Sequence, residues 1–235
     1  MPKAKVTEKP VDDFVCRFCD KVFVRESSFV KHLCEKKKKF IDRELPHVRL
    51  GYSVYCLFYK FNYGKEQPAD HFRKSKLYNA FVQFGRYMID VQAIEPMEFA
   101  QFVIEKGASL PIDRWGTDAV YETYVRNRTM KETPEVAAER TILLMQQWAI
   151  ESGNDYRDFF RLISTPRAVH WIRSGRISPW MLYATQSGQE LLQRFNGEEV
   201  NIVSGYIDPA MWKRRIKLFA KEVDSLSEIF KEVGL

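Results

Sequence analysis

The sequence lacks the marks of a membrane protein, of a secreted protein and of a disulfide-stabilised scaffold. No run of about 18 apolar residues occurs that would span a bilayer. The opening stretch MPKAKVTEKPVDD has no apolar core of the kind that a secretory signal needs. Only four cysteines are spread over 235 residues, and a chain of this length builds its core without disulfides. We therefore expect a cytoplasmic protein with no membrane partner.

Motifs of the common enzyme classes are missing as well. The sequence contains no GxxxxGK(S/T) or GxGxxG loop for phosphate groups, no HExxH metal motif and no GxSxG nucleophile motif. Of the four histidines, we interpret His170 as a packed or capping residue and His71 as a residue that faces solvent or a phosphate. We therefore expect no enzymatic activity.

What the sequence does have is helical periodicity, which begins at Tyr52. Hydrophobic residues make up 45% of the composition, which is typical of a globular protein with a core. In TPEVAAERTILLMQQWAIESG, Thr133 is a typical N-cap, Pro134 a typical first residue and Gly153 a typical end, so this is the clearest helix. The same cap-then-proline opening recurs at Thr165-Pro166, Ser178-Pro179 and Asp208-Pro209. Only the short segment EEVNIVSGYI has the character of a strand.

Residues 14–40 follow a different pattern, that of a two-cysteine, two-histidine zinc finger. The matching positions are Phe14, Cys16, Cys19, Phe23, Phe29 and His32. Two thiolates on a tight turn and an imidazole on the following helix place three ligands around one tetrahedral zinc ion. The phenylalanines form a core too small to hold without the metal. A redox thiol pair is a weaker interpretation, because the strand-then-helix context of thioredoxin-like folds is absent.

The fourth ligand departs from the finger pattern. A histidine or cysteine is expected at positions 36 to 38, where the sequence has lysines. Cys34 follows His32 by two residues, which on a regular helix is roughly 200° of rotation. Both therefore face one metal only if the helix ends or tightens at Leu33. We predict Zn²⁺ bound by Cys16, Cys19, His32 and Cys34, with the more distant His47 as the alternative to Cys34.

These patterns predict a mainly α fold class with an N-terminal ββα-type finger and an all-helical body. The predicted domains are a flexible lead over residues 1–13, the zinc finger over residues 14–40, a linker over residues 41–51, an N-terminal helical lobe over residues 52–112 and a C-terminal helical lobe over residues 113–235. Pro46 and Gly51 are the punctuation on which the linker depends.

The excess of positive charge lies near the N-terminus and favours DNA as a partner. Residues 1–50 carry 13 Lys/Arg against 8 Asp/Glu, whereas residues 51–235 carry 24 against 23. The resemblance to zinc fingers implies DNA-facing side chains at Arg25, Ser27, Ser28 and Lys31. We interpret Lys36, Lys37, Lys38 and Lys39 as phosphate contacts that hold DNA without reading its sequence. A solvated helix end or a targeting signal are the alternatives for this lysine run.

The body resembles a known family over about residues 45–220. The segments that carry the resemblance are, in order, GYSVYCLFYKF, FRKSKLYNAFVQFGRYM, Trp115 and Asp118 before AVYETYVRNR, YRDFFRLISTP, IRSGRISPWMLY and IDPAMWKRRIKLF. They resemble the helicase-loading proteins of T4-type bacteriophages, and RSGRIS is the most distinctive of them. The finger lies outside this family pattern, so we interpret it as a fused addition.

The resemblance implies an all-helical protein of two domains without enzymatic activity. Such a protein binds forked and single-stranded DNA, contacts the single-strand-binding protein and recruits the replicative helicase. The N-terminal lobe would then resemble an HMG-type DNA binder, with Arg73, Lys74 and Lys76 beside Tyr78 as a DNA-facing surface. A solvated helix start is an equally good interpretation of this basic cluster.

Three hypotheses follow for the function. The first is a DNA-binding replication accessory protein that loads a helicase, in the cytoplasm of a phage-infected bacterial cell. The second is a zinc-finger transcription regulator whose helical body binds other proteins. The third is a structural or assembly protein of a virion with a structural zinc ion.

Overall fold

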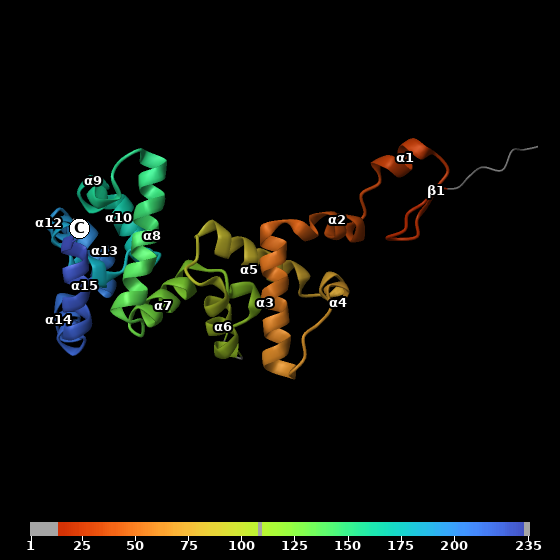
Figure 1. Ribbon diagram of the computed structural model, residues 1–235. Helices are drawn as coiled ribbons and strands as arrows, with labels where there is room; N and C mark the ends of the chain where they lie inside the picture. The colour runs from red at the N-terminus through yellow and green to blue at the C-terminus, as the bar shows by residue number, and fades with distance from the viewer. Residues whose placement is uncertain (1–13, 108–109, 233–235) are drawn as a thin grey trace, which may run out of the picture. The chain divides into compact units, whose positions relative to one another are not determined.

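The computed structural model describes residues 14–107 and 110–232, and the lead expected over residues 1–13 lies outside them. The predicted fold class is confirmed: the described chain is mainly helical, with one two-stranded sheet at its start (Figure 1). The chain divides into two compact units, Met1–Arg86 and Tyr87–Leu235, which we call unit 1 and unit 2. No described helix combines the length and the apolar character that crossing a membrane requires.

Unit 1 begins with a small ββα element, in which two strands pair antiparallel with Phe14 opposite Phe23. Its elements are β1 (Phe14–Val15), β2 (Val22–Phe23), α1 (Glu26–Lys31), α2 (Glu35–Ile41), a 3-10 turn η1 (Asp42–Glu44), α3 (Pro46–Tyr63), α4 (Ala69–Lys74) and the start of α5 (Tyr78–Asp90). Phe72, Phe81 and Phe84 are buried among α3, α4 and α5 and form the core of this unit.

The linker predicted over residues 41–51 is wrong in its structure, because this stretch is largely helical. Pro46 opens α3 as its first residue, where a missing N–H costs nothing. Gly51 does not end a helix but lets α5 approach α3 closely: a Cβ there would lie 2.7 Å from the Phe81 carbonyl oxygen. Gly85 has the same role from the other side, because its Cβ would lie 2.3 Å from the His47 carbonyl oxygen.

The described residues of unit 2 form only helices and 3-10 turns. They are α6 (Pro96–Lys106), the 3-10 turn η3 (Ile112–Arg114), α7 (Asp118–Thr129), α8 (Pro134–Ser152), the 3-10 turn η4 (Tyr156–Asp158), α9 (Phe159–Leu162), α10 (Thr165–Arg173), α11 (Pro179–Ala184), α12 (Gln186–Gln193), α13 (Gly197–Ile207), α14 (Pro209–Leu218) and α15 (Ala220–Glu232). The predicted helix α8 is confirmed, and Gly153 ends it in the left-handed conformation, with φ of 71°. The strand-like segment is instead α13, since Asn196 and Glu199 form a capping box at its start.

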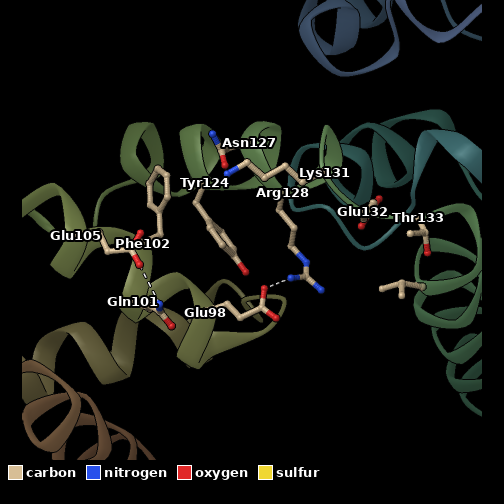
Figure 2. Close-up of a pocket in the computed structure, with 11 residues that line it drawn as sticks. Glu98, Gln101, Phe102, Glu105, Tyr124, Asn127, Arg128, Lys131, Glu132 and Thr133 are labelled. Carbon is tan, nitrogen blue, oxygen red and sulfur yellow. Dashed lines mark hydrogen bonds and ion pairs between the residues drawn. The ribbon is translucent and has the colours of Figure 1, made fainter. Parts of the chain in front are cut away.

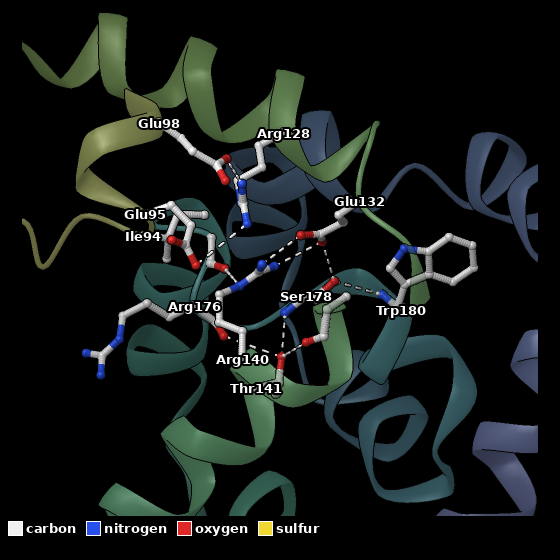
Figure 3. Close-up of polar contacts among 12 residues, drawn as sticks. Ile94, Glu95, Glu98, Arg128, Glu132, Arg140, Thr141, Arg176, Ser178 and Trp180 are labelled. Carbon is white, nitrogen blue, oxygen red and sulfur yellow. Dashed lines mark hydrogen bonds and ion pairs between the residues drawn. The ribbon is translucent and has the colours of Figure 1, made fainter. Parts of the chain in front are cut away.

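The interior of unit 2 combines tryptophans with one buried ionic network. Trp115, Trp180 and Trp212 are almost fully buried. Figure 3 shows the Arg140 guanidinium holding both oxygens of Glu132, at 2.7 and 2.9 Å, while the Ser178 hydroxyl donates to the same carboxylate at 2.9 Å. The RSGRIS segment ends at Ser178, so the end of this segment has a structural role in the network.

Candidate metal centre

Four potential ligands come together at the start of unit 1. The Sγ atoms of Cys16, Cys19 and Cys34 and a ring nitrogen of His32 all lie within 4.8 Å of one another. Cys16 is buried and the other three are half-buried, and none of the four cysteines of the chain forms a disulfide. Three thiols and one imidazole at this spacing could hold one metal ion.

The turn between β1 and β2 positions the first two ligands. The backbone N–H groups of Cys19 and Asp20 both donate to the carbonyl oxygen of Cys16, at 3.3 and 2.8 Å. Asp20 takes a left-handed conformation with φ of 58°, which short polar side chains tolerate. This tight turn folds Cys19 back toward Cys16, so that both thiols point to one side.

A break between two helices positions the other two ligands. α1 ends at Lys31, and both His32 and Cys34 have extended backbone, with ψ of 120° and 161°. In an extended chain alternate side chains point the same way. His32 and Cys34 therefore both face the cluster, whereas Leu33 points away and remains 59% exposed. The two-residue spacing that is unfavourable on a helix is thus suitable here.

The surroundings of the two thiols in the turn shift their pKa values in opposite directions. The backbone N–H of Phe18, and less strongly that of Cys19, lower the pKa of the Cys16 thiol. The Lys21 backbone also lowers the pKa of Cys19, but partial burial and the neighbouring Cys16 and Cys34 thiols outweigh it and raise that pKa. The Cys19 thiol lies 3.2 Å from Nε2 of His32. Cys34 caps α2, because its sulfur accepts the backbone N–H of Lys37 at 3.4 Å.

The alternative ligand lies elsewhere. His47 is near the start of α3, where its Nε2 contacts the Arg86 guanidinium at 3.2 Å. Cys56, the remaining cysteine, donates to the Gln67 carbonyl oxygen at 3.6 Å. The structure thus brings Cys34, rather than His47, to the three ligands of the finger pattern.

The segment around the cluster has almost no hydrophobic core. Between residues 14 and 45, all of which are described, Cys16 is the only buried residue. Phe29 contacts Phe14 and Phe23 at centroid distances of 5.8 and 6.0 Å, but all three rings are only half-buried. A fold with so little buried apolar surface needs another source of order, and a metal bound to the cluster would supply it.

The side chains that the finger resemblance assigns to DNA lie exposed on or beside α1. Arg25 immediately precedes this helix, and Ser27, Ser28 and Lys31 lie on it. Within the described residues, none of these four side chains forms a hydrogen bond or an ion pair. They are therefore accessible, but a helix of six residues presents only a short surface to a groove.

The four lysines of α2 divide into two pairs. Lys37 donates to the His32 carbonyl oxygen at 3.0 Å, which ties it to the metal cluster. Lys39 forms an ion pair with Glu35 at 2.7 Å and lies 4.5 Å above the Tyr78 ring. The side chains of Lys36 and Lys38 are exposed and have no partner among the described residues. Of the four lysines of α2, only these two have no partner among the described residues.

In the basic cluster expected at residues 73–76, one cation is already paired and two are exposed. Arg73 on α4 forms an ion pair with Asp70, whereas Lys74 and Lys76 are exposed. Tyr78 is only 6% exposed, because its ring packs against Phe72 and is covered by a lysine. This corrects the expectation that Tyr78 faces DNA.

The two units carry opposite charge. Residues 1–86 have 19 Lys/Arg and 10 Asp/Glu, a net charge of +9, whereas residues 87–235 have 18 and 21, a net charge of −3. The attraction for a polyanion therefore belongs to unit 1.

Unit 2 contains a hollow of about 590 Å³ whose carboxylates, unlike several lysines of unit 1, are paired with neighbouring side chains. Figure 2 shows Arg128 reaching the Glu98 carboxylate across it, and Gln101 donating to Glu105 at 2.8 Å. Its carboxylates are thus already paired with neighbours, so we place no site there.

Sequence reasoning missed the aromatic side of this region. Phe18 and Phe40 lie in contact, with ring centroids 5.2 Å apart, and Arg17 and Arg43 lie against the two rings. The pairing of Arg17 with Phe18 inside the Cys-x-x-Cys turn was the available signal.

Comparison of the chain with protein-family models, with curated proteins and with solved structures finds no match. The assignment of function therefore depends on the site itself.

Proposed function

We propose that the protein is a non-enzymatic, zinc-stabilised DNA-binding accessory protein of replication, which holds forked or single-stranded DNA and loads a replicative helicase onto it. The observation that carries DNA binding is the group of uncommitted cations next to the metal cluster, in a unit with a net charge of +9. Lys36 and Lys38 have no protein partner among the described residues, so phosphate groups are their natural partners.

Zinc is the metal that we propose for the cluster. Three thiolates and one imidazole form the soft, four-coordinate ligand set of structural zinc sites. With all four positions taken by protein atoms, such a site has no open position for a substrate. Its role is therefore to hold the finger in shape.

The helicase-loading part is supported by the resemblance of residues 45–220 and by the surface of unit 2. A unit with a net charge of −3 does not attract DNA, which leaves its surface for proteins. Val136, Leu143 and Ile150 recur every seven residues along α8, and they are 44%, 60% and 86% exposed. Exposed apolar side chains in one line suit a contact with the helicase or the single-strand-binding protein, in the cytoplasm of a phage-infected cell.

The DNA-binding part is tested by a salt-titrated binding series on a fork, a single strand and a duplex of equal length. We expect the fork and the single strand to bind more tightly than the duplex, with affinities that fall steeply with salt. Equal affinity for all three would contradict fork loading. Preference for one duplex sequence would favour the transcription regulator, and no binding to any DNA would favour the structural protein.

The loading part is tested by helicase-dependent unwinding of a fork coated with single-strand-binding protein. We expect Leu143→Glu with Ile150→Glu to lower the rate of loading without changing DNA affinity. The matched control is Leu162→Glu, which adds a charge at a residue of unit 2 that is 56% exposed but lies on α9 rather than on α8. Unchanged loading by the double variant would show that this line of α8 contacts neither partner.

A further inference from the structure

Unit 1 contains a cavity of about 380 Å³ beside the metal cluster, which we call the finger pocket. Five of the side chains that line it are cationic, two are phenylalanines and one, Asp70, is a carboxylate. The side chains that matter here are Arg17, Phe18, Lys36, Phe40, Arg73 and Lys74. A cavity of this size accommodates a small ligand. Its cationic and aromatic lining is complementary to an anion that also has a flat apolar part.

The rings supply the flat apolar part of the lining. Phe18 and Phe40 are both half-buried, so part of each ring remains accessible from the pocket. The Arg17 guanidinium lies 4.9 Å from the centroid of Phe18 and 6.0 Å from that of Phe40. Aromatic rings flanked by arginine are the surfaces on which proteins stack unpaired bases, with the cation close to the adjoining phosphate.

The cations supply the binding of a negative group. Arg73 already pairs with Asp70, the one carboxylate among the residues that line the pocket, and Lys39 pairs with Glu35. Lys36 and Lys74 are exposed and have no ion-pair partner among the described residues. The pocket therefore keeps an uncompensated positive charge after its internal pairs are counted.

We propose that the finger pocket takes one unpaired base and its phosphate from single-stranded DNA. This deepens the DNA-binding function proposed above and rests on it. A base inside a duplex is stacked and paired, so it enters such a cavity only after it is extruded from the duplex. A ligand that is phosphate alone would leave the two rings without a role. The pocket thus gives the finger a preference for single strands that a groove-reading helix does not explain.

The test compares two strands of equal length and charge, one of thymidines and one made entirely of abasic sites. For the zinc-loaded full chain, we expect the thymidine strand to bind about tenfold more tightly, or by about 1.4 kcal/mol, because one of its bases stacks on the aromatic rings. Phe40→Leu keeps an apolar side chain but removes the ring, so we expect this ratio to fall to about one. Zinc content and circular dichroism confirm that the variant is folded.

The matched control for the ring is Phe61→Leu, at a residue of unit 1 that is 55% exposed and does not line the pocket. It should keep the ratio. A second pair avoids any doubt over folding: Lys36→Gln and Lys38→Gln remove equal charge from exposed positions of α2, but only Lys36 lines the pocket. Both should weaken duplex binding equally, and Lys36→Gln should weaken thymidine-strand binding several-fold more than Lys38→Gln.

Three results would overturn the proposal. The first is equal binding of the thymidine and abasic strands by the unmodified protein. This result would contradict base binding in the finger pocket but would leave general DNA binding intact. The second is equal behaviour of the two lysine variants on the thymidine strand. The third is displacement of the strand by an equimolar amount of thymidine monophosphate, which would make the pocket a site for free nucleotides. Failure to bind any DNA would contradict the proposed function as well.

Discussion

The Cys34 ligand gives the sharpest prediction about the metal centre. Cys34→Ser removes one of four donors while keeping the size of the side chain. Substitution of groups that merely orient a ligand lowers metal affinity by about 10–100-fold. We therefore expect loss of a ligand itself to lower zinc affinity by at least about 100-fold, or about 2.7 kcal/mol.

The structure indicates why lower zinc affinity should also destabilise the fold of the finger. Phe14, Phe23 and Phe29 are half-buried, and half of the value for a fully buried side chain gives about 3 kcal/mol for the three together. Apparent binding free energies of structural zinc in fingers are about 10–16 kcal/mol. A bound zinc ion would thus be the larger source of stability, and weaker binding should leave residues 14–45 disordered at limiting zinc.

The assay is competition with a chromophoric chelator, followed by elemental analysis of the purified protein at one zinc per chain. Cys56→Ser and His47→Ala are the controls, because both residues lie outside the cluster. Full zinc affinity in Cys34→Ser, or loss of the metal in His47→Ala, would refute the ligand set.

Four further outcomes follow from the packing and from the charges. Gly85→Ala places a Cβ 2.3 Å from a backbone oxygen and should destabilise unit 1 by about 1–3 kcal/mol or more, whereas Gly197→Ala in unit 2, with open space around it, should not destabilise its own unit. All five tryptophans lie in residues 87–235, so urea melts followed by circular dichroism and by tryptophan fluorescence should separate the two units. Arg140→Met leaves the buried Glu132 carboxylate unpaired and should cost about 3–5 kcal/mol in the fluorescence melt. Lys36→Gln with Lys38→Gln should flatten the slope of log affinity against log salt for duplex by about 1.8, from two phosphate contacts.

The metal cluster was predictable because its information is local. Cys16, Cys19 and His32 follow a spacing that a tight turn and one helix convert directly into a cluster. The choice of Cys34 over His47 as the fourth ligand is not local in the same way, because the sequence does not show where α1 ends. Once the chain is extended from His32 to Cys34, the choice between Cys34 and His47 follows from the alternation of side chains.

The linker and the finger pocket could not be found in the same way. Gly51 is commonly a sign of a turn, but here its value lies in the contact with α5, thirty residues further along the chain. The pocket joins a turn at Phe18, a helix at Phe40 and another helix at Arg73. No local pattern predicts such a meeting, because it depends on tertiary packing rather than on spacing.

The metal cluster and the finger pocket share their two supporting elements, which leads to a final prediction. Phe18 lies between Cys16 and Cys19 in the turn, and Phe40 lies on α2, which begins directly after Cys34. A metal bound to these cysteines would tie the two walls of the pocket together. Removal of zinc by a chelator should therefore abolish the preference for a thymidine strand over an abasic strand, while lysines and arginines still hold both strands at low salt. Restoring zinc should restore the preference, and the measurement is the same pair of strands before chelation, after it and after zinc is added back. A base preference that survives complete loss of the metal would show that the pocket holds its shape without the cluster.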